Sequence, residues 1–281
     1  MGEVRLPSRP DRVYPGYVFD LDGTVYLGDA LLPTAAETIA ELRRRGSRLV
    51  YVTNKPLETA QDYADKLTRL GVPTQRREVV TSVDALVDYL NREHPHAVVL
   101  AVAERSTTDE LVAAGFQVTE SPAQAEVVVV SFDRTFDYEK LNAAFRAVRY
   151  HGATIVATNP DPYCPTPDGG IPDCAAMLAA VEACSGARAE AVVGKPSAHM
   201  ARALLARLAM DAHDVAVVGD RLATDMAMAR SLSMTGVLVL TGATSVESVA
   251  DSEVQPQHVI GSLSELIPEG ISQHEPEGLF R

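Results

Sequence analysis

The chain has 281 residues, 46% of them apolar, and a formal net charge of −13. This length allows one or two domains with a sizeable core, and the apolar fraction is typical of a globular protein. The acidic balance argues against nucleic acid and against an anionic membrane as partners, because both would repel the chain. Cys164, Cys174 and Cys184 show no CxxC spacing, which favours reduced thiols and a cytoplasmic location.

Short β-branched stretches alternate with helical patterns along most of the chain. The predicted strands are, in chain order, 17–21, 48–53, 97–102, 127–131, 154–158, 191–194, 215–219 and 237–241. The predicted helices lie near 34–45, 56–70, 83–92, 107–114, 138–150, 173–184, 197–209 and 223–232. This alternation predicts an α/β fold with a mostly parallel sheet. The stretch 127–130 is apolar throughout, which indicates a strand that is covered on both faces.

Polar residues follow four of the predicted strands. They are Asp20 with Asp22, Thr53 with Asn54, Lys195, and Asp220 with Asp225 one helical turn later. Because ligands bind at the carboxyl ends of the strands in open α/β sheets, we expect these residues to converge at one edge. Two carboxylates one residue apart at a buried strand end are costly unless a cation or a proton holds them. The pair Asp20 and Asp22 therefore indicates a metal site with a nucleophile.

The spacing of these residues predicts a domain inserted into another domain. Asp20 to Thr53 is 33 residues and Lys195 to Asp220 is 25, and each distance is one strand–helix–strand step. The 142 residues from Thr53 to Lys195 are about a hundred more than one such step needs, and they contain strands and helices of their own. We therefore expect a discontinuous core at 1–82 and 188–281, with an inserted domain at 83–187.

The charges at the expected site favour a divalent cation. Four aspartates and one lysine sum to −3, which one proton on Asp22 and one divalent ion would bring to zero. Oxygen ligands without His or Cys favour a hard metal, and we expect Mg²⁺. Such an ion would let an acidic chain accept an anionic substrate. Together with a lysine, a hydroxyl group and a carboxylate nucleophile, it would complete a phosphoryl-transfer site.

Four short motifs resemble those of the haloacid dehalogenase-like (HAD) phosphatases. They are DLDGTV at 20–25, VTN at 52–54, GKP at 194–196 and GDRLATD at 219–225. With the insertion and the stretch ATNPD at 157–161, the chain is similar to the NagD-like, para-nitrophenylphosphatase branch of subclass IIA. The resemblance covers about 16–262. It implies a Rossmann-like, three-layer parallel-sheet core and an inserted α/β cap of the C2 type that closes over the site.

The resemblance also implies roles for the motif residues. Asp20 would be the nucleophile that forms an aspartyl-phosphate, and Asp22 would be the general acid and base. Thr53 would hold phosphoryl oxygens, and Lys195 would stabilise the nucleophile and the phosphate. The implied Mg²⁺ ligands are Asp20, Asp22 through its backbone carbonyl, Asp220 and Asp225. Lys55 stands where relatives often have Asn.

Two substrate-binding candidates lie in the insertion, and each has a structural alternative. Thr158 and Asn159 repeat the pattern of Thr53 and Asn54, but the 33-residue step favours Thr53 as the phosphoryl clamp. Asn159 is then either substrate-facing or structural. Asp173 either contacts substrate or caps the helix that follows it. The full set of substrate-binding candidates is Gly23, Asn54, Asn159 and Asp173.

We predict a Mg²⁺-dependent phosphatase of small phosphorylated metabolites, such as sugar, polyol or nucleotide phosphates. One alternative is a phosphotransferase that passes the phosphoryl group to an alcohol. A second is a non-catalytic sensor of phosphorylated ligands, against which the intact pair Asp20 and Asp22 argues. A third is a dehalogenase, which would need neither a second acid nor a metal. A homo-oligomer formed through the cap is left open.

Overall fold

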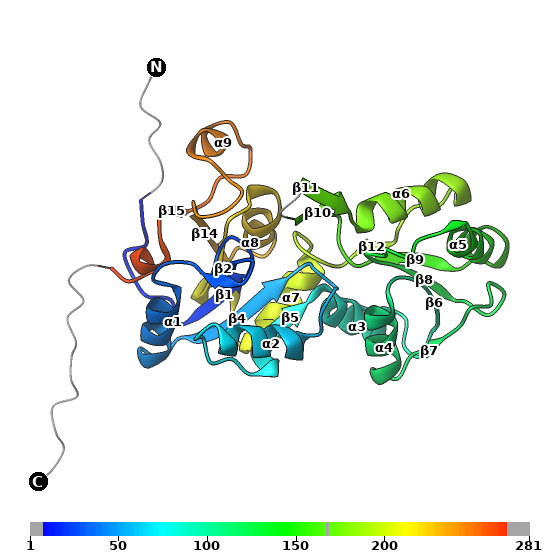
Figure 1. The fold of residues 1–281 in the computed structure, drawn as a ribbon, viewed down its shortest axis with the longest axis horizontal. Coiled ribbons are helices and arrows are strands. Elements are labelled where there is room, and N and C mark those ends of the chain that lie inside the picture. Colours follow the sequence, from blue (N-terminus) through cyan, green and yellow to red (C-terminus); the bar gives the residue numbers. More distant parts are fainter. Residues whose placement is uncertain (1–7, 167–168, 269–281) are drawn as a thin grey trace, which may run out of the picture.

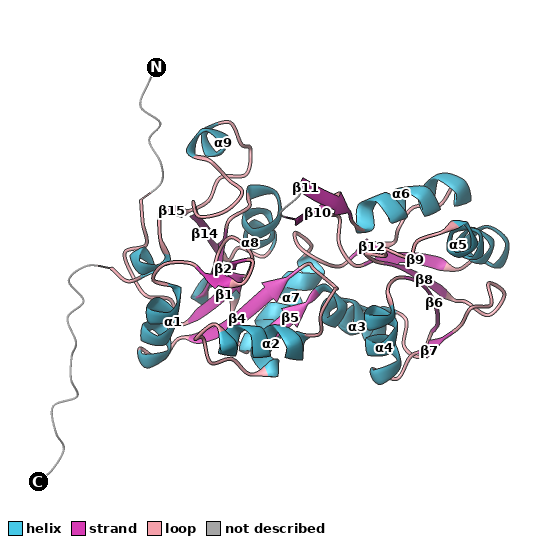
Figure 2. Cartoon of the chain, viewed as in Figure 1, coloured by secondary structure: helices cyan, strands magenta, loops and turns pink. Residues whose placement is uncertain are grey.

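The computed structural model describes residues 8–166 and 169–268, and the described chain forms an elongated molecule with two parallel sheets side by side (Figure 1). The outer ends of the expected core, 1–7 and 269–281, lie outside the described residues. Strands alternate with helices through both halves (Figure 2). This arrangement confirms the predicted α/β class.

The first sheet has six strands, all parallel, in the order β15–β14–β13–β1–β4–β5. Their bounds are β1 Gly16–Asp20, β4 Arg48–Thr53, β5 Val79–Thr81, β13 Val215–Gly219, β14 Thr235–Val239 and β15 His258–Ile260. Asp20 lies opposite Val52, and Phe19 lies opposite Val218. The carboxyl ends of β1, β4 and β13 therefore finish side by side at one edge of the sheet.

Helices cover both faces of the first sheet and give it three layers. On one face Tyr17 and Phe19 pack in a cluster with residues of α1 (Ala35–Arg44) and α2 (Ala60–Arg69). On the other face Val18 packs in a cluster with residues of three helices of this half, and the same cluster reaches Leu111 in the second half. The three helices are α3 (Ser82–Glu93), α7 (Ala198–Leu208) and α8 (Ala227–Ser231). Because successive side chains of a strand point to opposite faces, a strand covered on both faces must be apolar throughout.

The second sheet has five parallel strands in the order β12–β9–β8–β6–β7. Their bounds are β6 Val98–Val102, β7 Gln117–Val118, β8 Val127–Val130, β9 Thr154–Ala157 and β12 Ala191–Val192. The helices of this half are α4 Arg105–Ala113, α5 Tyr138–His151 and α6 Cys174–Ser185. Strand β12 pairs with β9, so the second sheet continues past the boundary that we expected at 187.

One apolar cluster, which we call the shared cluster, contains residues of both sheets. It includes Val18 and Val50 of the first sheet and Val127 of the second, together with Leu86 and Leu90 of α3. Helix α3 follows β5 directly and lies between the two sheets in Figure 1. The two halves therefore do not bury separate cores on this side.

Several short elements were not predicted. They are the strands β2 Tyr26–Leu27, β3 Ala30–Leu31, β5, β7, β10 Tyr163–Thr166, β11 Gly169–Pro172 and β15, and the helix α9 Val246–Ala250. The helix expected near 223–232 begins as a π-helix at Leu222–Met226 and continues as α8.

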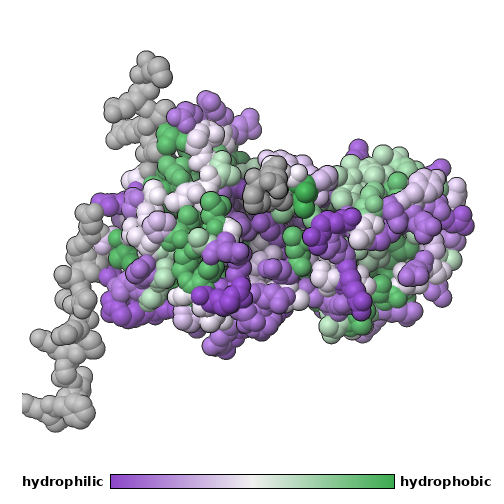
Figure 3. All heavy atoms as spheres, viewed as in Figure 1, coloured by the Kyte–Doolittle hydropathy of each residue, from purple (hydrophilic) through white to green (hydrophobic). Residues whose placement is uncertain are grey.

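Within the described residues no helix is both long enough and apolar enough to cross a bilayer. On the face shown in Figure 3, hydrophobic surface is divided into separate patches bounded by hydrophilic residues.

Candidate active site

The four predicted segments meet in one pocket at the carboxyl edge of the first sheet. Asp20 and Thr53 end β1 and β4, Asp220 follows β13, and Lys195 lies between β12 and α7. The pocket takes residues from both halves of the molecule. It is lined by Asp20, Asp22, Thr53, Asn54, Lys55, Asp161, Tyr163, Cys164, Asp173, Lys195, Arg221 and Thr224.

The Lys195 ammonium bridges two buried carboxylates. Its Nζ lies 2.5 Å from Asp20 Oδ1 and 2.8 Å from Asp225 Oδ1. Burial disfavours the charge on Lys195, but the two carboxylates outweigh burial and raise the pKa of this lysine. Removing one partner from such a group would leave an uncompensated buried charge, which is strongly destabilising. Lys195 therefore stays charged and fixes the positions of both acids.

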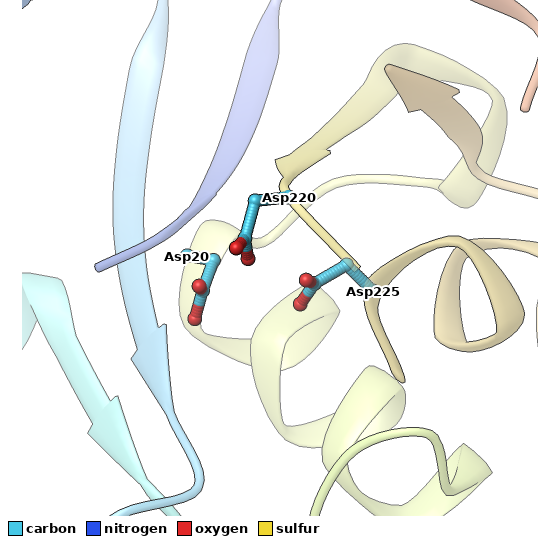
Figure 4. Close-up of side chains that lie close together, drawn as sticks. All are labelled: Asp20, Asp220 and Asp225. Carbon is cyan, nitrogen blue, oxygen red and sulfur yellow. The ribbon is translucent and has the colours of Figure 1, made fainter. Parts of the chain in front are cut away.

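Three carboxylates form a cluster beside the pocket, of which Asp20 lines the pocket and Asp220 and Asp225 do not. Asp20, Asp220 and Asp225 each offer an oxygen within 4.8 Å of the others, and Asp225 points toward the other two (Figure 4). Burial raises the pKa of Asp20 to about 6, and the Asp225 charge adds to this although Lys195 opposes it. Burial also raises the pKa of Asp220 to about 6, with the Asp20 charge as a second cause. The cluster is thus costly to ionise without a further cation.

Asp220 also carries a polar atom without a partner. Its Oδ1 is buried and accepts no hydrogen bond from the described part of the chain. Buried polar atoms are nearly always satisfied, so such an exception requires an explanation. An oxygen-only donor set with an unsatisfied carboxylate oxygen fits a hard divalent cation such as Mg²⁺.

Two loops hold the Asp220 carboxylate in one orientation. The Ala243 backbone N–H donates to Oδ2 at 2.7 Å, and the Thr244 hydroxyl donates to the backbone carbonyl of Asp220 at 2.6 Å. A Cβ on Gly242 would lie 2.0 Å from Oδ2, and a Cβ on Gly23 would lie 2.6 Å from it. Gly23 also has a φ of +80°, which favours glycine. Gly23, expected to bind substrate, is buried against Asp220 and does not line the pocket.

Asp22 stands apart from the carboxylate cluster. Its Oδ2 accepts a hydrogen bond from Lys55 Nζ at 3.0 Å, and about a third of its side chain (34%) is exposed. Burial opposes the charge on Lys55, but Asp22 outweighs burial and raises the pKa of the lysine. Asp22 is thus an accessible carboxylate, whereas Asp20 is buried against Lys195.

Asn54 joins the two halves of the molecule at the pocket. Its Oδ1 accepts from the backbone N–H of Lys195 at 2.8 Å. Its Nδ2 donates to the Lys195 carbonyl at 3.0 Å and to Asp161 Oδ2 at 2.9 Å. The neighbouring Thr53 hydroxyl accepts from the Lys55 N–H at 3.1 Å. Asn54 lines the pocket as expected, but its amide is already used in positioning Lys195 and Asp161.

The structure changes the interpretation of Asn159. This residue is fully buried and does not line the pocket. Its Nδ2 donates to the Asn54 carbonyl at 3.2 Å and to Asp173 Oδ1 at 3.5 Å, and its Oδ1 accepts from the Asp161 N–H at 2.9 Å. The expected substrate contact of Asn159 is therefore replaced by a supporting role behind Asn54 and Asp161.

Asp173 fits both of its alternatives. Its Oδ1 accepts from the Cys174 N–H at 2.6 Å at the start of α6, so it caps that helix. It also lines the pocket, where burial raises its pKa to about 6 and the Asp161 charge adds to the shift.

Sequence reasoning did not assign site roles to six residues that line the pocket. They are Lys55, Asp161, Tyr163, Cys164, Arg221 and Thr224. A signal existed for Lys55, which directly follows Thr53 and Asn54, and for Asp161, which ends the ATNPD stretch. Arg221 and Thr224 lie within the GDRLATD motif. Tyr163 and Cys164 belong to a short strand that we did not predict.

Comparison with known proteins gives two family models that match the chain. A haloacid dehalogenase-like hydrolase model matches residues 17–117, and a HAD-hydrolase-like model matches residues 192–266. The sugar-phosphatase AraL of Bacillus subtilis is 35% identical over 259 residues, which is 91% of this chain and 94% of that protein.

Solved structures with the same fold cover nearly the whole chain. The 4-nitrophenylphosphatase of Thermotoga maritima has a TM-score of 0.85 at 32% identity, covering 90% of this chain and 96% of that one. A glycerol phosphate phosphatase of Mycobacterium tuberculosis, solved in complex with magnesium, has a TM-score of 0.82 at 31% identity. That match covers 90% of this chain and 76% of the other.

Proposed function

This chain is a phosphatase of the haloacid dehalogenase-like hydrolase family, in its para-nitrophenylphosphatase (NagD-like) branch, and we propose that it hydrolyses small phosphate monoesters with Mg²⁺ through an aspartyl-phosphate on Asp20. One observation carries this proposal. Lys195 holds Asp20 and Asp225 together beside Asp220, while Asp22 remains accessible with a different partner. Two acids in such different environments suit two chemical roles.

Asp20, Asp220 and Asp225, with the backbone carbonyl of Asp22, would hold the Mg²⁺ ion. The oxygen-only donors and the unsatisfied Asp220 Oδ1 support this assignment, as does the magnesium complex of the Mycobacterium tuberculosis relative. The ion, when bound, supplies positive charge that offsets the substrate phosphate and the surrounding acids.

The reaction that we propose has two steps on this chain's own residues. In the first, an Asp20 carboxylate oxygen forms a bond to phosphorus, the ester O–P bond breaks, and protonated Asp22 gives its proton to the leaving oxygen. In the second, Asp22 takes a proton from water, the water oxygen attacks phosphorus, and the Asp20 O–P bond breaks to release inorganic phosphate. Lys195 and the Thr53 hydroxyl would stabilise the phosphoryl oxygens throughout.

Asp22 must part from Lys55 to perform this proton transfer. The pair is partly exposed, and exposed ion pairs of this kind are weak, so an entering substrate can displace the contact. Lys55 then lies next to the Asp22 side of the pocket, where it would help to attract an anionic substrate.

We propose that sugar and polyol phosphates are favoured over nucleotides. Of the three relatives reported above, one is named as a sugar phosphatase and one as a glycerol phosphate phosphatase, while the third is named as a 4-nitrophenylphosphatase. A further relative, 31% identical, is named as a 5'-nucleotidase, so the ranking depends on the pocket wall. Asp161 and Asp173 line the wall contributed by the second half, and carboxylates accept hydrogen bonds from hydroxyl groups. This wall would receive a hydroxyl-rich leaving group better than one with further negative charge.

We also propose the division into a core and an inserted cap, with its second boundary moved behind β12 because that strand pairs with the second sheet. The cap would exclude bulk water from the pocket during phosphoryl transfer. A homo-oligomer through the cap and a cytoplasmic location stay predictions, which gel filtration with light scattering and cell fractionation would check.

The test is a phosphate-release screen over sugar, polyol and nucleotide phosphates and pyridoxal phosphate, with and without EDTA. We expect release with Mg²⁺, none with EDTA, and the fastest turnover on a sugar or polyol phosphate. Parallel reactions with added alcohols and labelled substrate would detect a phosphotransferase. Release that is indifferent to chelation would reject the metal assignment, and transfer of label to the alcohol in preference to water would reject the hydrolase.

A further inference from the structure

A second hollow opens at the amino ends of the strands of the first sheet, opposite the carboxyl ends where the active-site pocket lies. Its volume is about 520 Å³, and it is lined by the arginines Arg43, Arg48, Arg77 and Arg207 and by Glu78, among others. We call it the arginine hollow. Arg48 is the first residue of β4, whereas Thr53 in the active-site pocket is the last. At about 3.3 Å per residue, the two sites are roughly 17 Å apart along the strand.

The arginine hollow is strongly positive in an acidic chain. Four arginines and one glutamate leave a formal charge of +3, although the whole chain carries −13. Arg43 neutralises the glutamate, because its Nη2 lies 2.9 Å from Glu78 Oε1. Among the residues that the structure describes, Arg48, Arg77 and Arg207 form no ion pair with a carboxylate. The excess charge is therefore available to a ligand.

Backbone contacts position two of these arginines. Arg48 Nη1 donates to the Leu208 carbonyl at 2.9 Å, and Arg207 Nη1 donates to the Arg77 carbonyl at 2.9 Å. These contacts tie β4, the end of α7 and the segment before β5 together around the hollow. A guanidinium has five N–H donors, so one carbonyl contact leaves most of them unused.

Helix capping does not account for all of these residues. Cations are favoured near a helix C-terminus, and this explains why Arg48 reaches the last turn of α7. It does not explain Arg77, which is exposed and whose side chain makes no hydrogen bond with the described residues. The lining also includes Leu49 and Leu208, which are buried and apolar, and low polarity nearby strengthens electrostatic contacts.

We propose that the arginine hollow binds a small compound that carries two or more linked phosphate groups. The planar guanidinium fork matches the geometry of phosphate oxygens and forms paired hydrogen bonds with them. A single phosphate carries about −1.5 to −2 charges at pH 7, fewer than the three arginines without a carboxylate partner. A diphosphate group matches that charge more closely. Free diphosphate and nucleoside diphosphates share this chemistry.

The test uses inorganic pyrophosphate and the full-length protein in EDTA, measured by isothermal titration and by thermal unfolding. The chelator is present because the acidic active-site pocket then has no bound cation to attract phosphate. We expect one binding site and a rise in Tm of several degrees. The double variant Arg77→Gln/Arg207→Gln should bind pyrophosphate at least about tenfold more weakly, since two charged contacts are lost.

Arg202→Gln is the matched control, because Arg202 is exposed on the same helix but does not line the hollow. It should bind as tightly as wild type. If the double variant fails to fold, Arg77→Gln alone serves, since its side chain makes no hydrogen bond with the described residues. Phosphate release by the variants should match wild type, so failure of the proposed hydrolase and failure of this site are separate results.

Other anions decide the ligand class. Inorganic phosphate and citrate should bind at least about tenfold more weakly than pyrophosphate, because they lack a diphosphate group. Tighter binding of ADP than of pyrophosphate would identify a nucleotide, equal binding would identify the bare diphosphate, and both support the proposal. Absence of binding, equal binding by the double variant, or equally tight binding of citrate would overturn it.

Discussion

In each of the two sheets, a buried aspartate lies at or shortly after the carboxyl end of one strand and is paired with a lysine. The two carboxylates differ in what else they contact. After β8 of the second sheet, Asp133 Oδ1 accepts from the N–H and hydroxyl of Thr135 at 2.9 and 2.6 Å. Its Oδ2 accepts from Lys140 Nζ at 2.6 Å. At the end of β1, Asp20 shares Lys195 with Asp225. Beside them Asp220 keeps a buried oxygen without a partner among the described residues.

The difference separates a carboxylate whose two oxygens both have partners from a group of acids that lacks this. Asp133 has a partner for each oxygen, so it already has what a buried charge needs. The three acids around Lys195 carry more negative charge than one ammonium can balance. A buried pair of opposite charges is therefore not sufficient to indicate a reaction site. Unsatisfied oxygens and uncompensated charge are the informative signs.

The largest expected effect contrasts the two aspartates directly. Asp20→Asn should lower kcat by about 10⁴-fold or more, because the proposed nucleophile is lost. Asp133→Asn should leave kcat within a few-fold but lower the free energy of unfolding by about 2 kcal/mol, because charged hydrogen bonds are lost. Phosphate-release kinetics and urea denaturation measure the two effects. Equal loss of turnover in both variants would break the contrast.

Metal binding should also distinguish the acids around Lys195 from Asp133. Mg²⁺ should raise the Tm of the wild type by several degrees, because it binds the folded state only. Asp220→Asn should remove this rise, and Asp133→Asn should retain it. Thermal unfolding at several Mg²⁺ concentrations measures the effect without any need for activity. An undiminished rise in Asp220→Asn would contradict the assigned ligand.

A pH series in EDTA tests the excess of negative charge among the acids around Lys195. Burial and the Asp20 charge raise the pKa of Asp220 to about 6, so between about pH 4 and 6 the folded state keeps a proton that the unfolded chain has released. The stability contribution of this group therefore falls as pH rises through 6. Asp220→Asn has no such group, so its Tm relative to wild type should increase from pH 5 to 7.5. A difference that does not change with pH would remove this explanation.

The smallest expected effect is at the rim of the pocket. Lys55→Gln removes the partly exposed charge that would attract an anionic substrate, and a charge contact at such a site contributes about 0.2–1 kcal/mol, so kcat/KM should fall about two- to fivefold. Lys55→Arg keeps the charge and should restore most of the activity. Steady-state kinetics on one sugar phosphate would measure both variants. A loss in Lys55→Gln as large as that in Asp20→Asn would place Lys55 among the essential groups.

The longer strands could be predicted from the sequence because each is an apolar run covered on both faces. The predicted bounds of β4 and β13 are those observed. Strands such as β7 and β12 have only two residues, too few for a periodic pattern, and form because a neighbouring strand offers its edge. The sequence also does not tell which sheet a strand joins, so β12 was assigned to the wrong one.

At the site, the convergence of Asp20, Thr53 and Asp220 could be predicted because they end or follow strands that finish side by side in the first sheet. Lys195 also converges there as expected, but it follows β12 of the second sheet, so the shared edge of one sheet does not account for it. The position of Asn159 could not. Its sequence pattern equals that of Asn54, and only a contact between residues 105 positions apart, from Asn159 Nδ2 to the Asn54 carbonyl, separates a supporting role from a substrate contact. Contacts of this kind depend on how the two sheets face each other, and local sequence does not encode that.

The shared cluster limits how the molecule can be divided. A fragment of either half alone would return part of the shared cluster to water, at a cost of about 25 cal/mol per Å² of apolar surface exposed. We expect both fragments to aggregate. A chimera of two relatives would therefore have to take α3 from the same parent as the residues that it packs against in both halves. In a chimera joined only at the loops, the apolar side chains between the two halves would not fit one another.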